Sequence, residues 1–350
     1  MSRYYTRVCN FYYGYKSKKL VEEKKTLPLN GNVKISFDQI EIISRRFKKK
    51  ISINKINSLS KSHKKKVKLD LKIVTSKKKF FANLNFRKLP NIMGVLNLTP
   101  DSFSDGGRFN SRKKGITHAF EMFKSGAHII DIGGESTRPG SYAINTNLEW
   151  NRIKKILKHV CKKIPVSLDT RKSEIMRKGI KQGVKIINDV SGLSYDNETV
   201  NVLKKNQIPF VIQHSQGTPD KMQNKPTYKN EILDIYDFFE EKIKFLRSAG
   251  IKHNKIIIDP GIGFGKNLKH NMNLIKNISI FHSLGFPILV GNSRKRFIKE
   301  ISKNNDSKLR IGGTVASSIY MMTQGVQILR VHDVNEIMQG IKVYKEIFKN

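Results

Sequence analysis

Eight short apolar runs, each about four to six residues long, recur between residue 91 and the end of the chain. Segments with helical spacing lie between them; in one, Ile232, Ile235, Phe239, Ile243 and Leu246 recur at steps of three or four. Strands that are apolar along nearly their whole length are typical of a sheet buried on both faces. The runs span residues 92–97, 128–134, 165–170, 185–190, 210–214, 255–260, 287–292 and 327–332.

A strand followed by a helix, eight times in succession, predicts an α/β fold of the (β/α)8 barrel type, the TIM barrel. The alternative is an open doubly wound sheet, which usually has fewer strands and a glycine-rich first turn. In this chain the glycines are scattered over several strand ends, which favours the barrel.

Residues 1–88 lack the regular apolar runs of residues 89–350 and form a Lys-rich N-terminal extension. Apolar residues alternate with polar ones in two of its segments, 33–37 and 67–73, which predicts two half-buried strands. The extension is too small and too charged to bury much surface alone. We therefore expect a small β-containing cap on a barrel domain of residues 89–350.

The formal net charge is +39, and residues 1–90 hold 25 Lys and Arg against 5 Asp and Glu. Such asymmetry is compatible with a nucleic-acid-binding arm. The remainder of the chain is also rich in Lys, Asn and Ile, and the basic runs have no interleaved aromatic platform and match no RNA-binding signature. We therefore interpret the charge as a compositional bias and expect no nucleic-acid partner.

Two cysteines, Cys9 and Cys161, are too few for a disulfide scaffold. No apolar run has the length of a membrane span, and the N-terminus lacks the apolar region of a secretory signal. These features predict a cytoplasmic protein that has no membrane partner.

All eight apolar runs end in polar or ionisable residues, which a barrel would bring together at one mouth. Asp169 and Asp259 lie inside their runs, where an unpaired carboxylate would be costly unless it binds a ligand or a cation. For Thr170 and Asp189 a simple helix-capping role is equally compatible with their positions.

Arg330 and His332 are two residues apart and so face the same side of a strand. Together with Lys295 they suit a phosphate or pyrophosphate group. Buried Asp and Asn side chains suit a flat, amide-like heterocycle. A polyanionic leaving group would bring Mg²⁺, which prefers oxygen ligands and keeps its waters.

Eight motifs make the chain resemble the dihydropteroate synthase family, in that family's order and over about residues 91–345. The motifs are MGVLNLTPDSFSDGG (93–107), DIGGESTRPGS (131–141), LDTRK (168–172), INDVSG (187–192), DPGIGFGK (259–266), GNSRKRFI (291–298), GTVASS (313–318) and RVHDV (330–334). The resemblance implies a (β/α)8 barrel that condenses 6-hydroxymethyl-7,8-dihydropterin pyrophosphate with 4-aminobenzoate and releases pyrophosphate.

The resemblance also implies roles for single residues. Asp169, Asn188, Asp259 and Lys295 match residues that hold the pterin ring, and Asn97 matches the residue that meets Mg²⁺ and the pyrophosphate. Arg330 and His332 match the anion-binding pair, Arg330 also flanking the pterin, and Thr137 matches a ligand-contacting residue of the second loop. The catalytic set implied is Asp169, Asp259, Lys295, Arg330 and His332.

For the second substrate, Phe103, Asp105, Arg138 and Pro139 match two loops that close over the aminobenzoate. Ser293, Lys295 and Phe264 match the other walls of its site. The family is typically homodimeric through its late helices, so we expect a homodimer.

Two departures from the family pattern stand out. The fifth strand ends in Gln213-His214-Ser215 in place of Met-His-Met, and the second loop differs from Tyr142 onward. Two other readings remain: a folate-dependent methyltransferase barrel, which binds a similar pterin but needs no pyrophosphate site, and a barrel that has lost activity. Ser293-Arg294-Lys295 and Arg330-x-His332 favour the synthase over the methyltransferase.

Overall fold

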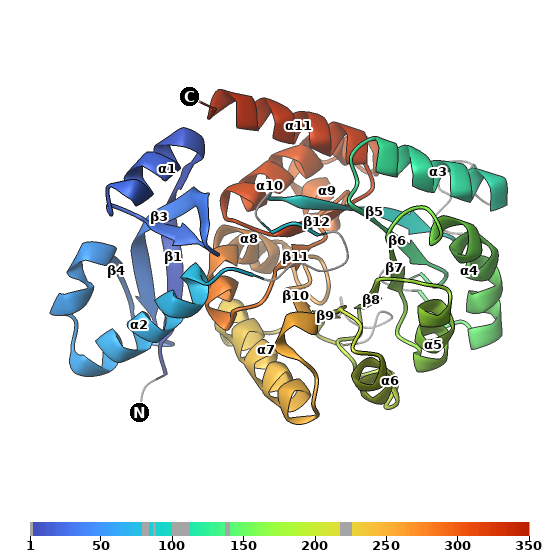
Figure 1. Ribbon diagram of the computed structural model, residues 1–350, viewed down its shortest axis with the longest axis horizontal. Helices are drawn as coiled ribbons and strands as arrows, with labels where there is room; N and C mark the ends of the chain where they lie inside the picture. The colour runs from blue at the N-terminus through green and yellow to red at the C-terminus, as the bar shows by residue number, and fades with distance from the viewer. Residues whose placement is uncertain are drawn as a thin grey trace.

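The computed structural model describes residues 3–78, 84–86, 89–99, 112–136, 141–217 and 226–349. Eight parallel strands form a ring surrounded by helices, and a smaller sheet lies beside it (Figure 1). The strands of the ring are β5 (Asn91–Asn97), β6 (Ile129–Gly133), β7 (Val166–Asp169), β8 (Ile186–Asp189), β9 (Phe210–Gln213), β10 (Ile256–Asp259), β11 (Leu289–Val290) and β12 (Ile328–Val331).

These strands confirm the eight predicted runs, with ends that differ by one or two residues. They pair in the order β10-β9-β8-β7-β6-β5-β12-β11, and a parallel bridge between Ile258 and Ile288 links the two outermost strands. The chain therefore forms the predicted (β/α)8 barrel. The surrounding helices are α3 (Arg112–Lys124), α4 (Thr146–Val160), α5 (Ser173–Lys181), α6 (Thr199–Asn206), α7 (Glu231–Ser248), α8 (Leu268–Lys276), α9 (Arg296–Ser302), α10 (Ile311–Thr323) and α11 (Val334–Ile347). Short 3₁₀ helices connect some of them: η3 (His253–Lys255), η4 (Ile278–Leu284) and η5 (Lys308–Arg310).

The strands are apolar on both sides because each side packs against a different layer. Ile130, Ile132 and Ile187 belong to the cluster between the strands and the outer helices. Ile129 and Ile186, one residue away, belong to a second cluster inside the base of the barrel. The continuous apolar runs of the sequence are thus two alternating sets of side chains.

The N-terminal extension is a four-stranded antiparallel sheet with two helices (Figure 1). Its central strand β3 includes the predicted alternating segment 33–37. The elements are β1 (Tyr5–Tyr13), α1 (Gly14–Glu22), β2 (Leu27–Leu29), β3 (Asn32–Ile43), β4 (Lys48–Ser52), η1 (Ile53–Ser58) and α2 (Lys61–Thr75).

The predicted strand at residues 67–73 is wrong, because these residues lie in helix α2. Val67, Leu71 and Val74 are buried at spacings of four and three, while Leu69 is 57% exposed. The apolar residues at 67 and 71 are one helical turn apart and face the core. The further apolar residues at 69 and 73 produced the apparent alternation. Asp70 is buried on the same face, where it accepts a hydrogen bond from Thr6 Oγ1 at 2.6 Å.

The extension shares a hydrophobic core with the base of the barrel. Val8, Phe37 and Leu71 from the extension cluster with Met93 and other base residues of the strands. Three buried residues of the connecting segment, Leu84, Phe86 and Leu89, belong to the same cluster. The extension thus buries its apolar side chains together with those of the barrel.

Polar contacts also hold the extension to the side of the barrel at α7 and η4. Arg45 donates to Asp234 at 2.7 Å and to Asp237 at 2.8 Å, and Tyr5 Oη donates to Asp237 at 2.8 Å. Ser279 Oγ donates to the carbonyl of Val8 at 2.8 Å. In the described part of the chain, no helix combines the length and hydropathy needed to cross a bilayer.

The helical register of α2 predicts unequal effects of one substitution at two leucines. Leu71→Ala should lower the free energy of unfolding by about 2–4 kcal/mol, since it opens a cavity in a packed core. Leu69→Ala should change it by less than about 0.5 kcal/mol, since Leu69 is largely in solvent. Urea denaturation followed by circular dichroism measures both values. Equal losses would contradict the register.

Candidate active site

The interior of the barrel changes from apolar at its base to polar at its mouth. Alternate residues of each strand face inward, so a buried aliphatic residue is followed two positions later by a polar one. The pairs, base residue first, are Ile129 and Asp131, Ile186 and Asn188, Val211 and Gln213, Ile257 and Asp259, and Ile328 and Arg330. The polar members therefore come together at the carboxyl ends of the strands, where barrel enzymes have their active sites.

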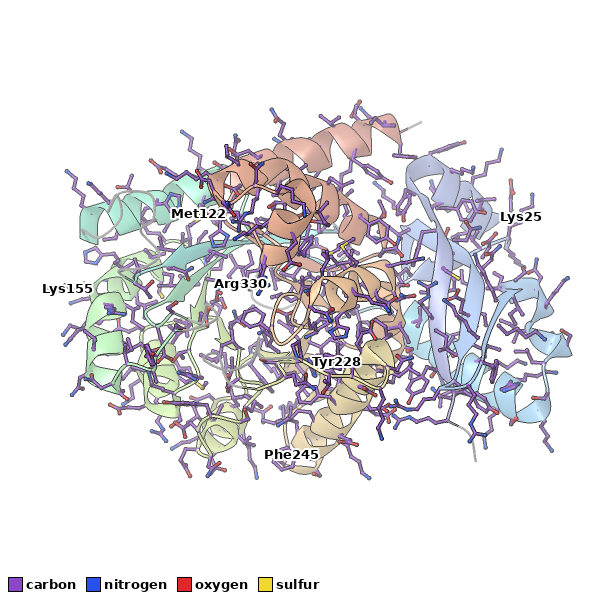
Figure 2. All side chains as sticks on the ribbon, turned by 180° about the vertical axis from the view of Figure 1, so that it is seen from behind. Lys25, Met122, Lys155, Tyr228, Phe245 and Arg330 are labelled. Carbon is purple, nitrogen blue, oxygen red and sulfur yellow. The ribbon has the colours of Figure 1, made fainter. Side chains whose placement is uncertain are left out.

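Arg330 connects two carboxylates inside the barrel, and Figure 2 shows it near the middle of the ring of strands. Its Nε donates to Asp131 Oδ2 at 2.6 Å and its Nη2 donates to Asp169 Oδ2 at 2.7 Å. Asn188 Nδ2 also donates to Asp131 Oδ2, at 3.0 Å. Since a buried charge needs a partner, this network fixes the position of the guanidinium. Two of its nitrogens face carboxylates, although the sequence grouped Arg330 with His332 as an anion-binding pair.

Five buried polar atoms in this interior have no hydrogen-bond partner among the described residues. They are Asp131 Oδ1, Ser167 Oγ, Asp169 Oδ1, Asn188 Oδ1 and Gln213 Nε2. A buried polar atom without a partner costs roughly 1–3 kcal/mol. Their concentration at one place therefore indicates a binding site for a flat ligand that has both donors and acceptors.

Burial raises the pKa of several carboxyls around this site. The pKa of Asp259 is raised to about 6 by burial, against the opposing effects of the Gly261 backbone N–H and the charges of Lys295, Arg330 and Lys266. Burial also raises the pKa of Asp169, with Arg330 opposing and Asp131 among the negative charges that add to the rise. These carboxyls would gain from a ligand that carries or develops positive charge.

Lys295 and Phe264, both predicted from the resemblance, lie together at the mouth. Lys295 Nζ lies 3.9 Å from the centroid of the Phe264 ring, a cation–π contact. The loop after β10 brings Phe264 there through Gly263, whose φ is +80°. A Cβ at Gly263 would lie 3.0 Å from Lys295 Cδ, so the close approach of the lysine needs a glycine.

The buried side chain of Lys266 stabilises the same loop through hydrogen bonds. Its Nζ donates to the carbonyls of Gly261 and Phe264, both at 2.9 Å, and lies 3.1 Å from Nδ1 of His214. Burial lowers the pKa of Lys266 to about 7, and burial, with the Lys266 charge, lowers that of His214 well below its ordinary value. His214 is thus a neutral acceptor that supports the loop.

Ser293 and His332, which were predicted separately, lie in contact in the structure. Ser293 Oγ lies 3.1 Å from His332 Nδ1 and accepts the backbone N–H of His332 at 3.2 Å. Arg294 Nε donates to Asp333 at 3.0 Å, which ties the loop after β11 to the end of β12. The two strand ends thus present their polar residues as one unit.

Asn97 ends β5 at the level of the same site, since it pairs with Gly133, which pairs with Asp169. The predicted loop residues Phe103, Asp105, Thr137, Arg138 and Pro139 lie outside the described residues. Asp189 accepts hydrogen bonds from the backbone N–H and Oγ of Ser191, which is a local turn role.

A buried ion-pair network anchors the start of the second loop at Glu135. The Glu135 carboxylate accepts from Arg171 Nε at 2.9 Å, Lys172 Nζ at 3.0 Å and the backbone N–H of Ile144 at 2.9 Å. Lys172 also donates to Glu149 at 2.6 Å, and Thr170 Oγ1 donates to the same carboxylate at 2.6 Å. The network connects both ends of this loop to the end of β7.

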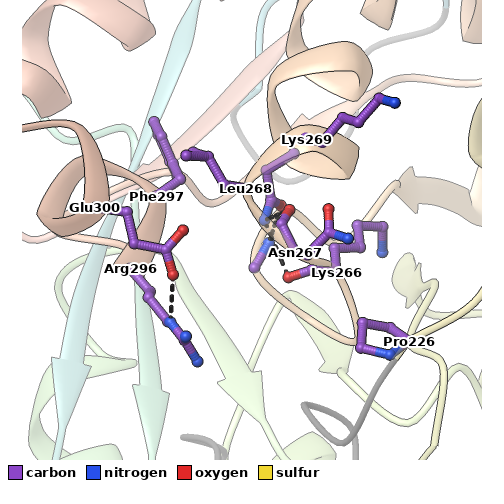
Figure 3. A pocket seen from close by; sticks show the side chains of 10 residues that line it. Pro226, Lys266, Asn267, Leu268, Lys269, Arg296, Phe297 and Glu300 are labelled. Carbon is purple, nitrogen blue, oxygen red and sulfur yellow. Dashed lines mark hydrogen bonds and ion pairs between the residues drawn. The ribbon is translucent and has the colours of Figure 1, made fainter.

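A cavity of about 310 Å³ lies outside the strand ring, between the starts of α8 and α9 (Figure 3). Lys269, Arg296 and Glu300 are among its lining residues, and Arg296 Nε donates to Glu300 at 2.6 Å. None of its lining side chains has a buried polar atom without a partner in the described part of the chain. The unsatisfied atoms place the candidate site in the barrel interior instead.

The chain is similar to known proteins over most of its barrel domain. The pterin binding enzyme family matches residues 93–332. Dihydropteroate synthase of Synechocystis is 40% identical over 260 residues, covering 74% of this chain and 90% of the relative. The Yersinia pestis dihydropteroate synthase structure with a sulfonamide drug complex has a TM-score of 0.73 at 36% identity, covering 76% of this chain and 97% of that one.

A third similar protein is the Xanthomonas albilineans dihydropteroate synthase, solved in complex with 7,8-dihydropteroate. It has a TM-score of 0.68 at 30% identity and covers 75% of this chain and 95% of that one. The fold and the site thus define a pterin binding enzyme. Within that class, the chain belongs to the dihydropteroate synthase family.

Asp131 and Glu135 are among the residues of the site that were missed from the sequence. Asp131 was not singled out because it lies in the middle of an apolar run, and Glu135 because it lies in a loop motif with other polar residues. The alternation along β6 could have revealed Asp131, since it places Asp131 on the inward face with Gly133.

The raised pKa of Asp259 predicts a pH-dependent contribution to stability. An acid whose pKa rises on folding stabilises the protein below its ordinary pKa and loses that contribution as the pH rises through about 6. Relative to Asp259→Asn, the free energy of unfolding of the unliganded protein should therefore fall by on the order of 2–3 kcal/mol between about pH 4 and pH 7. Urea denaturation at several pH values measures the difference. A difference independent of pH would show that Asp259 keeps its ordinary pKa.

The clamp on Arg330 predicts that Asp131 is costly to remove. Asp131→Ala should lower the free energy of unfolding by about 3–5 kcal/mol, because it leaves a buried guanidinium short of a partner. Ser167→Ala, in the strand next to Asp131, removes an unpartnered hydroxyl and should change it by less than about 1 kcal/mol. Thermal and urea unfolding provide both values. Similar losses in the two variants would argue against the clamp.

Proposed function

We propose that this chain condenses 6-hydroxymethyl-7,8-dihydropterin pyrophosphate with 4-aminobenzoate, forming 7,8-dihydropteroate and pyrophosphate for folate biosynthesis. A C–N bond forms at the pterin methylene while its C–O bond to pyrophosphate breaks, and the amine loses a proton. The observation that carries this assignment is the set of unsatisfied polar atoms around Arg330. The similarity to a synthase solved with 7,8-dihydropteroate supports it.

The unsatisfied atoms match the edge of a pterin ring. The pyrimidine half of a pterin offers an amino group and one ring N–H as donors, and a carbonyl oxygen and a ring nitrogen as acceptors. Asp131 Oδ1, Asp169 Oδ1 and Asn188 Oδ1 are acceptors, and Gln213 Nε2 is a donor. Gln213 stands where the family usually has methionine, so here the wall can hydrogen-bond to the ring.

The carboxylates have a second role in the chemical step. Departure of pyrophosphate leaves positive charge on the pterin methylene that spreads into the ring. Asp169 and Asp259, held in a site of low dielectric constant, stabilise this charge. Lys295 and His332 lie at the mouth, where they stabilise the departing anion. The arylamine itself is the nucleophile, so the mechanism needs no nucleophilic side chain.

The wall formed by Phe264, Lys295 and Ser293 suits the aminobenzoate. The Phe264 ring offers a flat apolar surface, and the Lys295 ammonium lies over it at 3.9 Å from the centroid. The family resemblance assigns Phe103, Thr137, Arg138 and Pro139, which lie outside the described residues, to the same substrate. Exclusion of water from such a site prevents hydrolysis of the activated pterin.

Mg²⁺ is the metal that we propose for the pyrophosphate. The described residues contain no cluster of three His, Cys, Asp or Glu side chains suited to a metal. The amide oxygen of Asn97, at the end of β5, is a hard oxygen donor and fits an ion bound largely by substrate phosphates and water. Bound there, Mg²⁺ would neutralise charge on the leaving group.

The activity is tested with the purified protein, the pterin pyrophosphate, 4-aminobenzoate and Mg²⁺. We expect dihydropteroate and pyrophosphate in equal amounts. Lys295→Ala should lower kcat/KM by at least about a hundredfold, since it removes a charge that binds the anion at the transition state. Lys299→Ala, an exposed lysine one turn further along α9, is the control and should leave kcat/KM within about twofold.

Each other outcome has a defined meaning. Pterin binding without release of pyrophosphate would favour the methyltransferase-type alternative or an inactive barrel. Equal effects of Lys295→Ala and Lys299→Ala would remove Lys295 from the site. Full activity after Mg²⁺ is chelated would contradict the proposed metal.

We also propose a homodimer formed through α10 and α11. Helix α10 contains no charged residue, yet Gly312, Ala316 and Tyr320 are exposed along one face. Val343 on α11, which packs against α10, is 58% exposed. In a chain in which 27% of residues are charged, an uncharged exposed face indicates a covered surface.

Sedimentation equilibrium tests the dimer. Val343→Glu should weaken dimerisation at least tenfold, because it buries a charge in the interface. Leu148→Glu on α4, where Leu148 is 42% exposed, adds the same charge on another face and should leave the dimer intact. A wild-type monomer, or equal behaviour of both variants, would refute this interface.

The cytoplasm is the proposed location. Cys9 and Cys161 are both free, which suits a reducing compartment. The substrates of the proposed reaction are small charged molecules that do not require a membrane.

A further inference from the structure

The extension carries a long stretch with positive charge only. Residues 42–69 include eleven Lys and Arg and no Asp or Glu. They form the last two residues of β3, the loop before β4, then β4, η1 and the first part of α2. Two separate parts of this stretch meet in space, because Phe47 before β4 contacts His63 in the first turn of α2, with ring centroids 5.9 Å apart.

Four exposed lysines follow one face of α2. Lys61, Lys65, Lys68 and Lys72 recur at steps of four, three and four residues, and they form no ion pair among the described residues. Like charges at these spacings repel. The first turn of α2 also lacks the acidic residues that would suit the positive end of the helix dipole. The four lysines therefore repel one another, and a bound anion would reduce this repulsion.

An aromatic cluster lies at the start of this lysine face. Tyr4 is 4.3 Å from His63 and 5.8 Å from Phe47 between ring centroids. Phe47 remains 39% exposed and follows the exposed Arg46 in the chain. The sequence argued against nucleic acid because the basic runs have no interleaved aromatic platform. Phe47 is a single ring within the run 45–50, and the fold adds Tyr4 and His63 from two other segments.

We propose that the lysine face of α2 and the Tyr4–Phe47–His63 cluster bind single-stranded nucleic acid. The lysines extend over about 16 Å of helix, which spans several consecutive phosphates and exceeds what one pyrophosphate needs. Unpaired bases stack on exposed aromatic rings. An acidic peptide has no bases to stack, and the bases of a duplex are already stacked on one another. Charge and aromatic surface together therefore favour a single strand.

The surface is remote from the barrel mouth. α2 and β4 lie at one end of the molecule, and α4 and α5 lie at the other, with the ring of strands between them (Figure 1). Binding there is therefore separable from the synthase activity, and failure of one proposal leaves the other intact.

The test is fluorescence anisotropy of a labelled oligouridylate of about 20 nucleotides with the full-length protein. Lys65→Gln, Lys68→Gln and Lys72→Gln together should weaken binding at least tenfold at low salt. The slope of log affinity against log salt should fall by about 2, since each phosphate contact to a single strand contributes about 0.7. Phe47→Ala should weaken binding about fivefold or more by removing a stacking surface.

A matched triple variant controls for net charge. Lys155→Gln, Lys158→Gln and Lys162→Gln remove the same charge on and just after α4, and Figure 2 shows Lys155 at the opposite end of the molecule from Lys25 in the extension. This variant should keep the wild-type salt slope. Both triple variants should keep wild-type kcat/KM and circular dichroism spectra, which shows that they fold.

Three results would overturn the proposal. Equal losses in the two triple variants would show that net charge alone attracts the probe. Binding of polyglutamate or of a duplex as tight as that of the oligouridylate would show that bases are not recognised. An unchanged affinity in Phe47→Ala would remove the aromatic cluster from the site.

Discussion

A single buried guanidinium organises the functional end of this barrel. Arg330 is shared by Asp131 and Asp169, so two carboxylates compete for one positive charge in a place that water hardly reaches. The barrel can keep such a group only because its base is filled with aliphatic side chains that hold the strands in register. Two carboxylates against one guanidinium leave net negative charge inside the mouth. This charge suits a ligand on which positive charge develops.

The sequence predicted most of this arrangement because strand ends in a parallel barrel converge whatever the details of the loops. Asp169, Asn188, Asp259 and Arg330 each lie near the end of an apolar run, and the structure places all four at the mouth. Asp131, one of the two partners of Arg330, was harder to find, because it lies in the middle of an apolar run and not at its end. Loop residues such as Phe103 and Arg138 were assigned through family resemblance alone.

In the extension, the spacing of apolar residues alone did not distinguish a helix from a strand. In a short segment, apolar residues at every second position fit a strand, and Val67 to Ile73 of α2 follow that spacing. What decides between helix and strand there is the surface against which the segment packs, which is η4 of the barrel together with β2 and η1 of the extension. The aromatic cluster escaped notice for a related reason, since its three rings come from residues 4, 47 and 63 and no window of sequence contains them together.

The packing of the extension against distant parts of the barrel has a consequence for how the chain is made. The extension leaves the ribosome before the barrel, yet the carbonyl of Val8 bonds to Ser279, 271 positions later, and Tyr13 bonds to the carbonyl of Thr323, 310 positions later. Translation proceeds at about 5–20 residues per second. Strand β1 is therefore synthesised well before Ser279 and Thr323, with which it bonds. Contacts of such long sequence separation form slowly. A high density of like charge on the waiting segment keeps it soluble and apart from other chains in the meantime.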